Sequence, residues 1–152
     1  MNEALTTLFV YGTLQPGERN YRVCEVYVVA SQPAIVQGSL YHLPFGYPAL
    51  TLEGDRAIQG VLFSLAGPKA LAILDEFEQH DPIALQQLVP NYPAAKLQYH
   101  RRSIAVMNLE QQVIGAAWAY VMTKEQIDRL GGLLYRQERW QEQIANHQVT
   151  LG

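Results

Sequence analysis

The first apolar run of the sequence stops abruptly at a glycine. Residues 7–11 (Thr-Leu-Phe-Val-Tyr) are typical of a β-strand, and Gly12 and Thr13 follow them directly. We therefore predict a strand over residues 7–11 that ends where its backbone comes close to another group. Free N–H groups just past such a strand end can bind an anion such as a carboxylate. An ordinary strand and turn would give the same residues, so both interpretations stay open.

Interior glycines recur in later predicted strands and indicate a bent sheet. Residues 34–43 contain Gly38, and residues 57–65 contain Gly60; a glycine inside a strand is typical of a bulge or bend. The residue patterns of 99–107 and 112–122 predict two more strands, and residues 53–55 predict a turn before the strand over residues 57–65. Residues 23–30 fit a strand or a short helix equally well.

The clearest predicted helix covers residues 68–78. Proline is favoured at its first position, and Leu71, Leu74 and Phe77 share one face at 100° per residue. Glu78 falls on the same face. A carboxylate buried without a cation has a raised pKa and becomes a usable acid or base near neutral pH. Escape of Glu78 to solvent at the helix end is the equal alternative.

The remaining elements complete the fold class. Residues 79–98 contain three prolines and no clean period, which predicts a long loop of functional interest. A capping box over residues 123–126 predicts a last helix, and we expect a further helical piece with Trp140 and Ile144 to pack on the body. The order strands, helix, strands, helix predicts an α+β fold with a curved or barrel-like, mixed or largely antiparallel sheet.

Composition and missing motifs exclude several function classes. The 152 residues are 49% apolar and 16% charged, which predicts one domain over residues 1–152. A net charge of −3 argues against a nucleic-acid or anionic-membrane surface, and no apolar stretch is long enough to span a membrane. Cys24 is alone and is interpreted as structural, and the four histidines lack metal-ligand spacing. We expect no metal, no cofactor, no signal peptide and a cytoplasmic location.

Six short elements, in their order along the chain, resemble one known family. They are Tyr11-Gly12-Thr13-Leu14, Tyr47-Pro48-Ala49-Leu50, Gln59-Gly60-Val61-Leu62-Phe63, Leu74-Asp75-Glu76-Phe77-Glu78, Tyr99-x-Arg101-x-x-Ile104-x-Val106 and Ala117-Trp118-x-Tyr120. Over roughly residues 8–122 they are similar to the γ-glutamylcyclotransferase-like family, including its γ-glutamylamine cyclotransferase and AIG2-like branches. The first element alone is a short signal, whereas six in order are specific.

The resemblance implies a small mixed β-barrel flanked by helices, with a cavity at its mouth. It implies that a γ-glutamyl amide is cleaved without water: the substrate's α-amine attacks the γ-carbonyl and releases 5-oxoproline and a free amine or amino acid. The family's catalytic glutamate ends the L-D-x-x-E helix, which here is Glu78. The substrate-binding residues of the family match Tyr11, Gly12, Thr13, Leu14 and Tyr120.

These residue types suit that reaction. One carboxylate of raised pKa can take a proton from the attacking ammonium and give one to the departing amine. Because ring closure is intramolecular, the protein needs mainly to fold the substrate into an attacking pose, with the N–H groups of residues 12–14 on its α-carboxylate. A donor must also stabilise the oxyanion on the γ-carbonyl, and Tyr120 or a loop N–H are both candidates.

The chain departs from the family pattern after Glu78. Glutamine follows in place of the usual glycine, and residues 79–98 replace a short link; this segment would act as a lid, a specificity loop or a dimer contact, or would block the mouth. We expect Tyr47 and Tyr99 to be structural and Arg101 to pair with a surface acid rather than with a substrate carboxylate.

Three functional hypotheses follow. The leading one is a γ-glutamyl cyclotransferase whose partner is a small γ-glutamyl substrate, with a homodimer left open. The second is a non-catalytic small-ligand or protein-binding module on the same barrel. The third is an enzyme of the same fold with another γ-glutamyl chemistry.

Overall fold

The computed structural model describes residues 6–18, 20–43, 48–67, 69–78, 99–137 and 139–140, with α1 side chains described to residue 75. In chain order the elements are β1 (Thr6–Val10), the 3₁₀ turns η1 (Tyr21–Val23) and η2 (Glu25–Tyr27), β2 (Val28–His42), β3 (Pro48–Leu65), α1 (Lys69–Glu78), β4 (His100–Met107), β5 (Val113–Val121), α3 (Lys124–Arg129) and β6 (Leu133–Leu134). The predictions on Tyr47, on residues 79–98 and on Ile144 lie outside the described residues.

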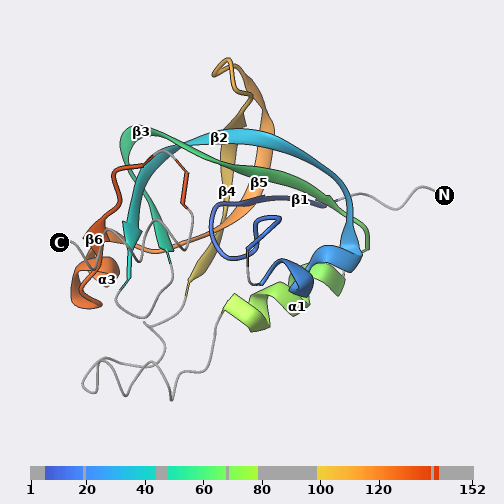
Figure 1. The fold of residues 1–152 in the computed structure, drawn as a ribbon, viewed down its shortest axis with the longest axis horizontal. Coiled ribbons are helices and arrows are strands. Elements are labelled where there is room, and N and C mark those ends of the chain that lie inside the picture. The colour runs from blue at the N-terminus through green and yellow to red at the C-terminus, as the bar shows by residue number, and fades with distance from the viewer. Residues whose placement is uncertain are drawn as a thin grey trace.

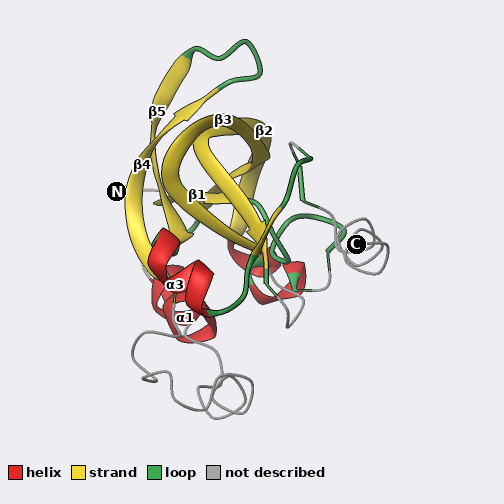
Figure 2. Ribbon diagram, turned by 90° about the vertical axis from the view of Figure 1, so that its left-hand side faces the viewer, coloured by secondary structure: helices red, strands yellow, loops and turns green. Residues whose placement is uncertain are grey.

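The described strands form one mixed sheet that closes on itself. Its order is β3-β1-β5-β4-β2-β6, and an additional pairing of β3 with β2 completes a ring of hydrogen-bonded strands (Figure 1). β1 pairs antiparallel with β3 and parallel with β5, and the other pairs are antiparallel. Viewed from the side, the ring curls around its own core and the helices gather at one end (Figure 2). The predicted α+β class with a curved, barrel-like mixed sheet is confirmed.

β2 and β3 form a long hairpin with a bulge where the sheet bends. Gly38 pairs with Arg56, but the next residue, Ser39, pairs with Thr51, so residues 52–55 of β3 have no register partner. The predicted bend at Gly38 is confirmed. The prediction that a turn at residues 53–55 separates two strands is wrong. β3 runs through these residues, and it pairs with β2 both before and after them.

Residues 23–30, for which the sequence allowed a strand or a short helix, contain both a 3₁₀ turn and the start of a strand. Glu25–Tyr27 form a 3₁₀ turn, and the strand starts at Val28. Cys24 lies between the two 3₁₀ turns, fully buried in the apolar core, as its structural interpretation predicts.

Two apolar cores lie on opposite sides of the sheet. Successive residues of β1 alternate between them, as in any strand: Leu8 and Val10 face one side, Phe9 the other. The inner core draws buried side chains from all five strands of the ring, and fully buried Trp140 closes it. The outer core lies between the sheet and α1, so the ring carries α1 on its outside face.

α1 packs on this outer core through the residues at helical spacing. Ala70 and Leu74, four residues apart, are fully buried, whereas Leu71 is only half-buried. The predicted helix is therefore confirmed, but its most buried residues are Ala70 and Leu74 rather than Leu71 and Leu74. The helix ends at Glu78, which continues the Ala70–Leu74 column at the same spacing.

The C-terminal part mixes a confirmed and a corrected prediction. Thr123 caps α3 through a capping box with Gln126, as predicted. Trp140 packs into the core, and its indole N–H donates to His42 Nδ1 at 3.2 Å. Residues 139–140 are not helical, contrary to the prediction: Arg139 instead makes a parallel β-bridge to Gln59 of β3.

Tyr11 ties three segments together inside the ring. Its hydroxyl donates to the Tyr120 carbonyl at 2.5 Å and accepts from the Leu50 N–H at 3.2 Å. These bonds are buried, so the Tyr11 hydroxyl provides hydrogen bonds to main-chain groups that are shielded from water.

Gly60 is required where β3 passes β1. A Cβ added there would meet the Val10 carbonyl oxygen and lie 2.6 Å from Phe9 Cζ. We therefore expect Gly60→Ala to lower the free energy of unfolding by about 1–3 kcal/mol in urea denaturation. Ser64→Ala, on the same strand, should change it by less than about 0.5 kcal/mol. Equal stability of Gly60→Ala and wild type would contradict this close fit.

Removing the Tyr11 hydroxyl should be costly because two buried backbone groups each lose a hydrogen bond. We expect Tyr11→Phe to destabilise the protein by about 1–3 kcal/mol in the same measurement. The matched control is Tyr27→Phe, since the half-buried Tyr27 hydroxyl makes no hydrogen bond within the described residues. Similar losses in both variants would show that the crosslink contributes nothing specific.

Candidate functional site

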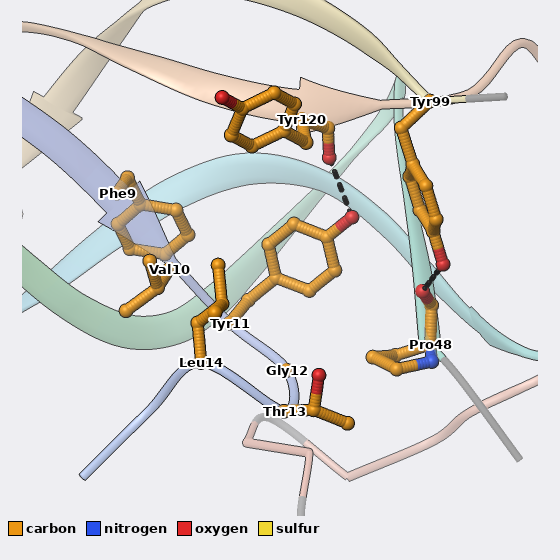
Figure 3. Close-up of a pocket in the computed structure, with 9 residues that line it drawn as sticks. All are labelled: Phe9, Val10, Tyr11, Gly12, Thr13, Leu14, Pro48, Tyr99 and Tyr120. Atoms are coloured by element: carbon orange, nitrogen blue, oxygen red, sulfur yellow. Dashed lines mark hydrogen bonds between the residues drawn. The ribbon is translucent and has the colours of Figure 1, made fainter. Parts of the chain in front are cut away.

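A small pocket lies at the end of β1, where the chain turns at Gly12. Its volume is about 30 Å³, and Figure 3 shows the residues around it. They are Phe9, Val10, Tyr11, Gly12, Thr13, Leu14, Pro48, Tyr99 and Tyr120. All five substrate-binding residues predicted from the sequence are therefore brought to one place, although Tyr120 is more than a hundred positions away. This is only two or three times the roughly 10–15 Å³ that one water needs, so a larger ligand requires the pocket to widen.

The turn after β1 offers unused backbone donors. Its carbonyls are engaged: the Gly12 oxygen accepts from the Gln15 N–H at 3.0 Å, and the Thr13 oxygen accepts from the Asn20 N–H at 2.9 Å. The N–H groups of Gly12, Thr13 and Leu14 donate to no acceptor within the described part of the chain. All three residues are buried. Buried backbone donors without a protein acceptor are rare, and three in a row at a pocket wall form a concavity suited to an anion.

Gln15 holds this turn in shape, a role that the sequence pattern did not reveal. Its side chain is 1% exposed, and Nε2 donates to the Tyr11 carbonyl at 2.9 Å and to the Trp140 carbonyl at 3.0 Å. Its Oε1 accepts from Arg139 Nε at 3.1 Å. Trp140 and Arg139 come from the far end of the chain, so no local signal marks Gln15 as more than a loop residue.

The opposite wall of the pocket is fitted closely to Gly12. A Cβ at Gly12 would lie 2.5 Å from Pro48 Cγ, so only glycine lets the turn approach β3. Tyr99 also lines this wall, and its hydroxyl donates to the Pro48 carbonyl at 2.5 Å (Figure 3). The aromatic wall of the pocket is thus held by main-chain hydrogen bonds.

Tyr120 connects the pocket with α1. Its hydroxyl donates to Asp75 Oδ1 at 2.7 Å and points away from Gly12 and Thr13 in Figure 3. Arg101 Nε lies 3.0 Å from the same oxygen, so the prediction that Arg101 pairs with an acid is confirmed. Asp75 is not among the residues to which the sequence pattern gave a role. The carboxylate in fact joins the helix to the sheet.

Glu78, the predicted catalytic residue, is the last residue of α1, and only its backbone is described. Asp75 lies three positions before it and reaches Tyr120, a residue of the pocket wall. The helix therefore ends within one turn of a contact with the pocket.

Neither a metal site nor a membrane-spanning helix is found in the described ranges. They contain no group of three His, Cys, Asp or Glu side chains placed to hold a metal ion. None of the described helices has the length and apolarity needed to cross a membrane.

Comparison with known proteins places this chain in a family. Residues 8–142 match the family described as gamma-glutamyl cyclotransferase, AIG2-like. A protein named gamma-L-glutamyl-butirosin B gamma-glutamyl cyclotransferase, from Niallia circulans, is 34% identical over 76 residues, which are 50% of this chain and 47% of that protein. The match thus spans about half the length of this curated relative.

Two solved structures share the fold over most of the chain. An AIG2-like protein of Mus musculus superposes with a TM-score of 0.63 at 19% identity, covering 91% of this chain and 90% of that one. YkqA of Bacillus subtilis gives a TM-score of 0.64 at 20% identity, covering 96% of this chain and 43% of that one. The chain belongs to the gamma-glutamyl cyclotransferase, AIG2-like family.

Proposed function

We propose that the protein is a γ-glutamyl cyclotransferase that converts a small γ-glutamyl amine or peptide into 5-oxoproline and a free amine or amino acid. The observation that carries this proposal is the convergence of Gly12, Thr13 and Leu14 with Tyr120 on one pocket, in a chain that belongs to this family.

N–H groups of the turn supply the binding site for the substrate's α-carboxylate. Backbone donors of this kind favour an anion, and no protein acceptor within the described residues competes for them. Once the carboxylate is fixed, the short γ-glutamyl chain can fold back so that its α-nitrogen meets its own γ-carbonyl. This pose is most of what an intramolecular ring closure requires.

Glu78 is the proposed acid and base. It accepts a proton from the α-ammonium, and the freed amine attacks the γ-carbonyl carbon. A new C–N bond closes the five-membered lactam, and the original γ-amide C–N bond breaks. The same carboxyl group then returns this proton to the departing nitrogen. The second proton that the new lactam nitrogen must lose also passes to that amine, which leaves as an ammonium ion, so no water is consumed and the charge of the substrate is conserved.

The oxyanion that forms on the γ-carbonyl needs a donor as well. Tyr120 has a single hydroxyl hydrogen, and that hydrogen is donated to Asp75. A backbone N–H of the turn is therefore the better candidate of the two that the sequence left open. The pocket must also widen from about 30 Å³ to hold a γ-glutamyl group, and the leaving group would lie outside it.

The experiment that tests this function measures 5-oxoproline release from γ-glutamyl amino acids, γ-glutamyl-ε-lysine, γ-glutamylamines and glutathione. We expect wild type to release 5-oxoproline from at least one of them, and Glu78→Gln to be slower by about 10²- to 10⁴-fold, because the amide cannot carry the proton. Glu110→Gln, which changes an exposed glutamate in the turn between β4 and β5, should keep wild-type activity.

Equal rates for wild type and Glu78→Gln would reject the role of Glu78. Binding of γ-glutamyl compounds without 5-oxoproline release would favour the non-catalytic binding module instead.

A further inference from the structure

The last turn of α1 is acidic in a way that the helix alone does not favour. Asp75, Glu76 and Glu78 are three of its last four residues, and the turn carries no basic residue. Negative charge near a helix C-terminus opposes the helix dipole, and carboxylates one turn apart repel each other. The helix end therefore needs support from outside, which the adjacent strands β4 and β5 provide.

That support is a single carboxylate oxygen shared by two strands. Asp75 Oδ1 accepts from the Tyr120 hydroxyl at 2.7 Å and lies 3.0 Å from Arg101 Nε. Arg101 and Tyr120 are direct register partners across the β4–β5 ladder, so their side chains leave the sheet side by side. One helix residue thus contacts both strands at the same level.

Arg101 is itself held in place. Its guanidinium lies over the Trp118 ring at 4.5 Å from the centroid, and Trp118 shares the face of β5 with Tyr120. The Arg101 and Asp75 side chains are 30% and 35% exposed, so the pair is better shielded than a fully solvated surface pair. Stacking reduces the number of rotamers that Arg101 must give up to meet Asp75.

The contact continues through Tyr120 to the pocket. The Tyr120 hydroxyl holds α1, while its carbonyl accepts from the Tyr11 hydroxyl at the start of the Gly12–Leu14 turn. Tyr120 is 5% exposed and lines the pocket, so little freedom is left to it. The two parts of the proposed site, the turn and the end of α1, are joined through this one residue.

We infer that Asp75 is a positioning residue for the cyclotransferase reaction: it clamps the end of α1 to Arg101 and Tyr120 and so fixes Glu78 relative to the turn that binds the substrate. The inference rests on the proposed function for the role of Glu78. Asp75 contributes to turnover through the helix, whereas substrate binding depends on the backbone of residues 12–14.

Two measurements test the clamp, and the first does not depend on activity. Amide hydrogen exchange should speed up over residues 75–78 in Asp75→Asn and in Tyr120→Phe. The matched control is Asp128→Asn, which removes an acid that pairs with Lys124 on α3, and it should leave these amides unchanged. Unchanged exchange in both test variants would overturn the clamp.

The second measurement separates positioning from a merely structural role. For the γ-glutamyl compound that wild type converts fastest, Asp75→Asn should lower kcat by about 10- to 100-fold, because a displaced acid–base group loses its attacking geometry. KM should change by less than about 3-fold, since the turn is untouched. The Asp75→Asn, Tyr120→Phe double variant should lose about as much as Asp75→Asn alone, because both changes act on the same hydrogen bond: the first weakens its acceptor and the second removes its donor.

A raised KM at unchanged kcat, or additive losses in the double variant, would overturn the inference while leaving the cyclotransferase function intact. If wild type releases no 5-oxoproline from any compound, the proposed function fails and with it the catalytic role of Asp75. The exchange measurement then still decides whether Asp75 clamps the helix.

Discussion

The close passage of β1 between β3 and β5 is the contact on which the rest of the structure depends. β1 has only five residues, yet it joins β3 on one side and β5 on the other and thereby closes the ring. Gly60 permits this passage because a larger residue would meet the backbone of Val10. The strand ends at the rim of the ring, where Gly12 fits against Pro48. The pocket is therefore a direct consequence of how the ring is closed.

Tyr120 connects the closed ring of strands to α1. On the inner side its carbonyl is fixed by Tyr11, and on the outer side its hydroxyl holds Asp75. Through its carbonyl and its hydroxyl, Tyr120 thus joins the end of β1 to α1, two parts of the chain that are far apart in the sequence. This arrangement explains how a small sheet with few helices can hold the proposed binding turn and the end of α1, with the proposed catalytic Glu78, in a constant relation, as the proposed reaction requires.

The sequence predicted the elements whose signals are local. The alternation of β4, the Gly38 bend, the helix over α1 and the capping box at Thr123 all depend on neighbouring residues, and each is confirmed. It missed what depends on distant partners. Gln15 meets Trp140, Asp75 meets Tyr120, and the strand β3 continues through residues 52–55 because β2 pairs with it on both sides. The five predicted binding residues came from the family resemblance, and the pattern of buried strands brings them together in one pocket.

The central claim is that the turn after β1 recognises the carboxylate of a γ-glutamyl group. The most direct measurement is a titration of isotope-labelled protein with 5-oxoproline, the expected product, followed by the amide resonances of each residue. The account predicts that the N–H signals of Gly12, Thr13 and Leu14 shift most, with saturation at one ligand per chain. Saturating shifts elsewhere, with these three amides unchanged, would contradict it.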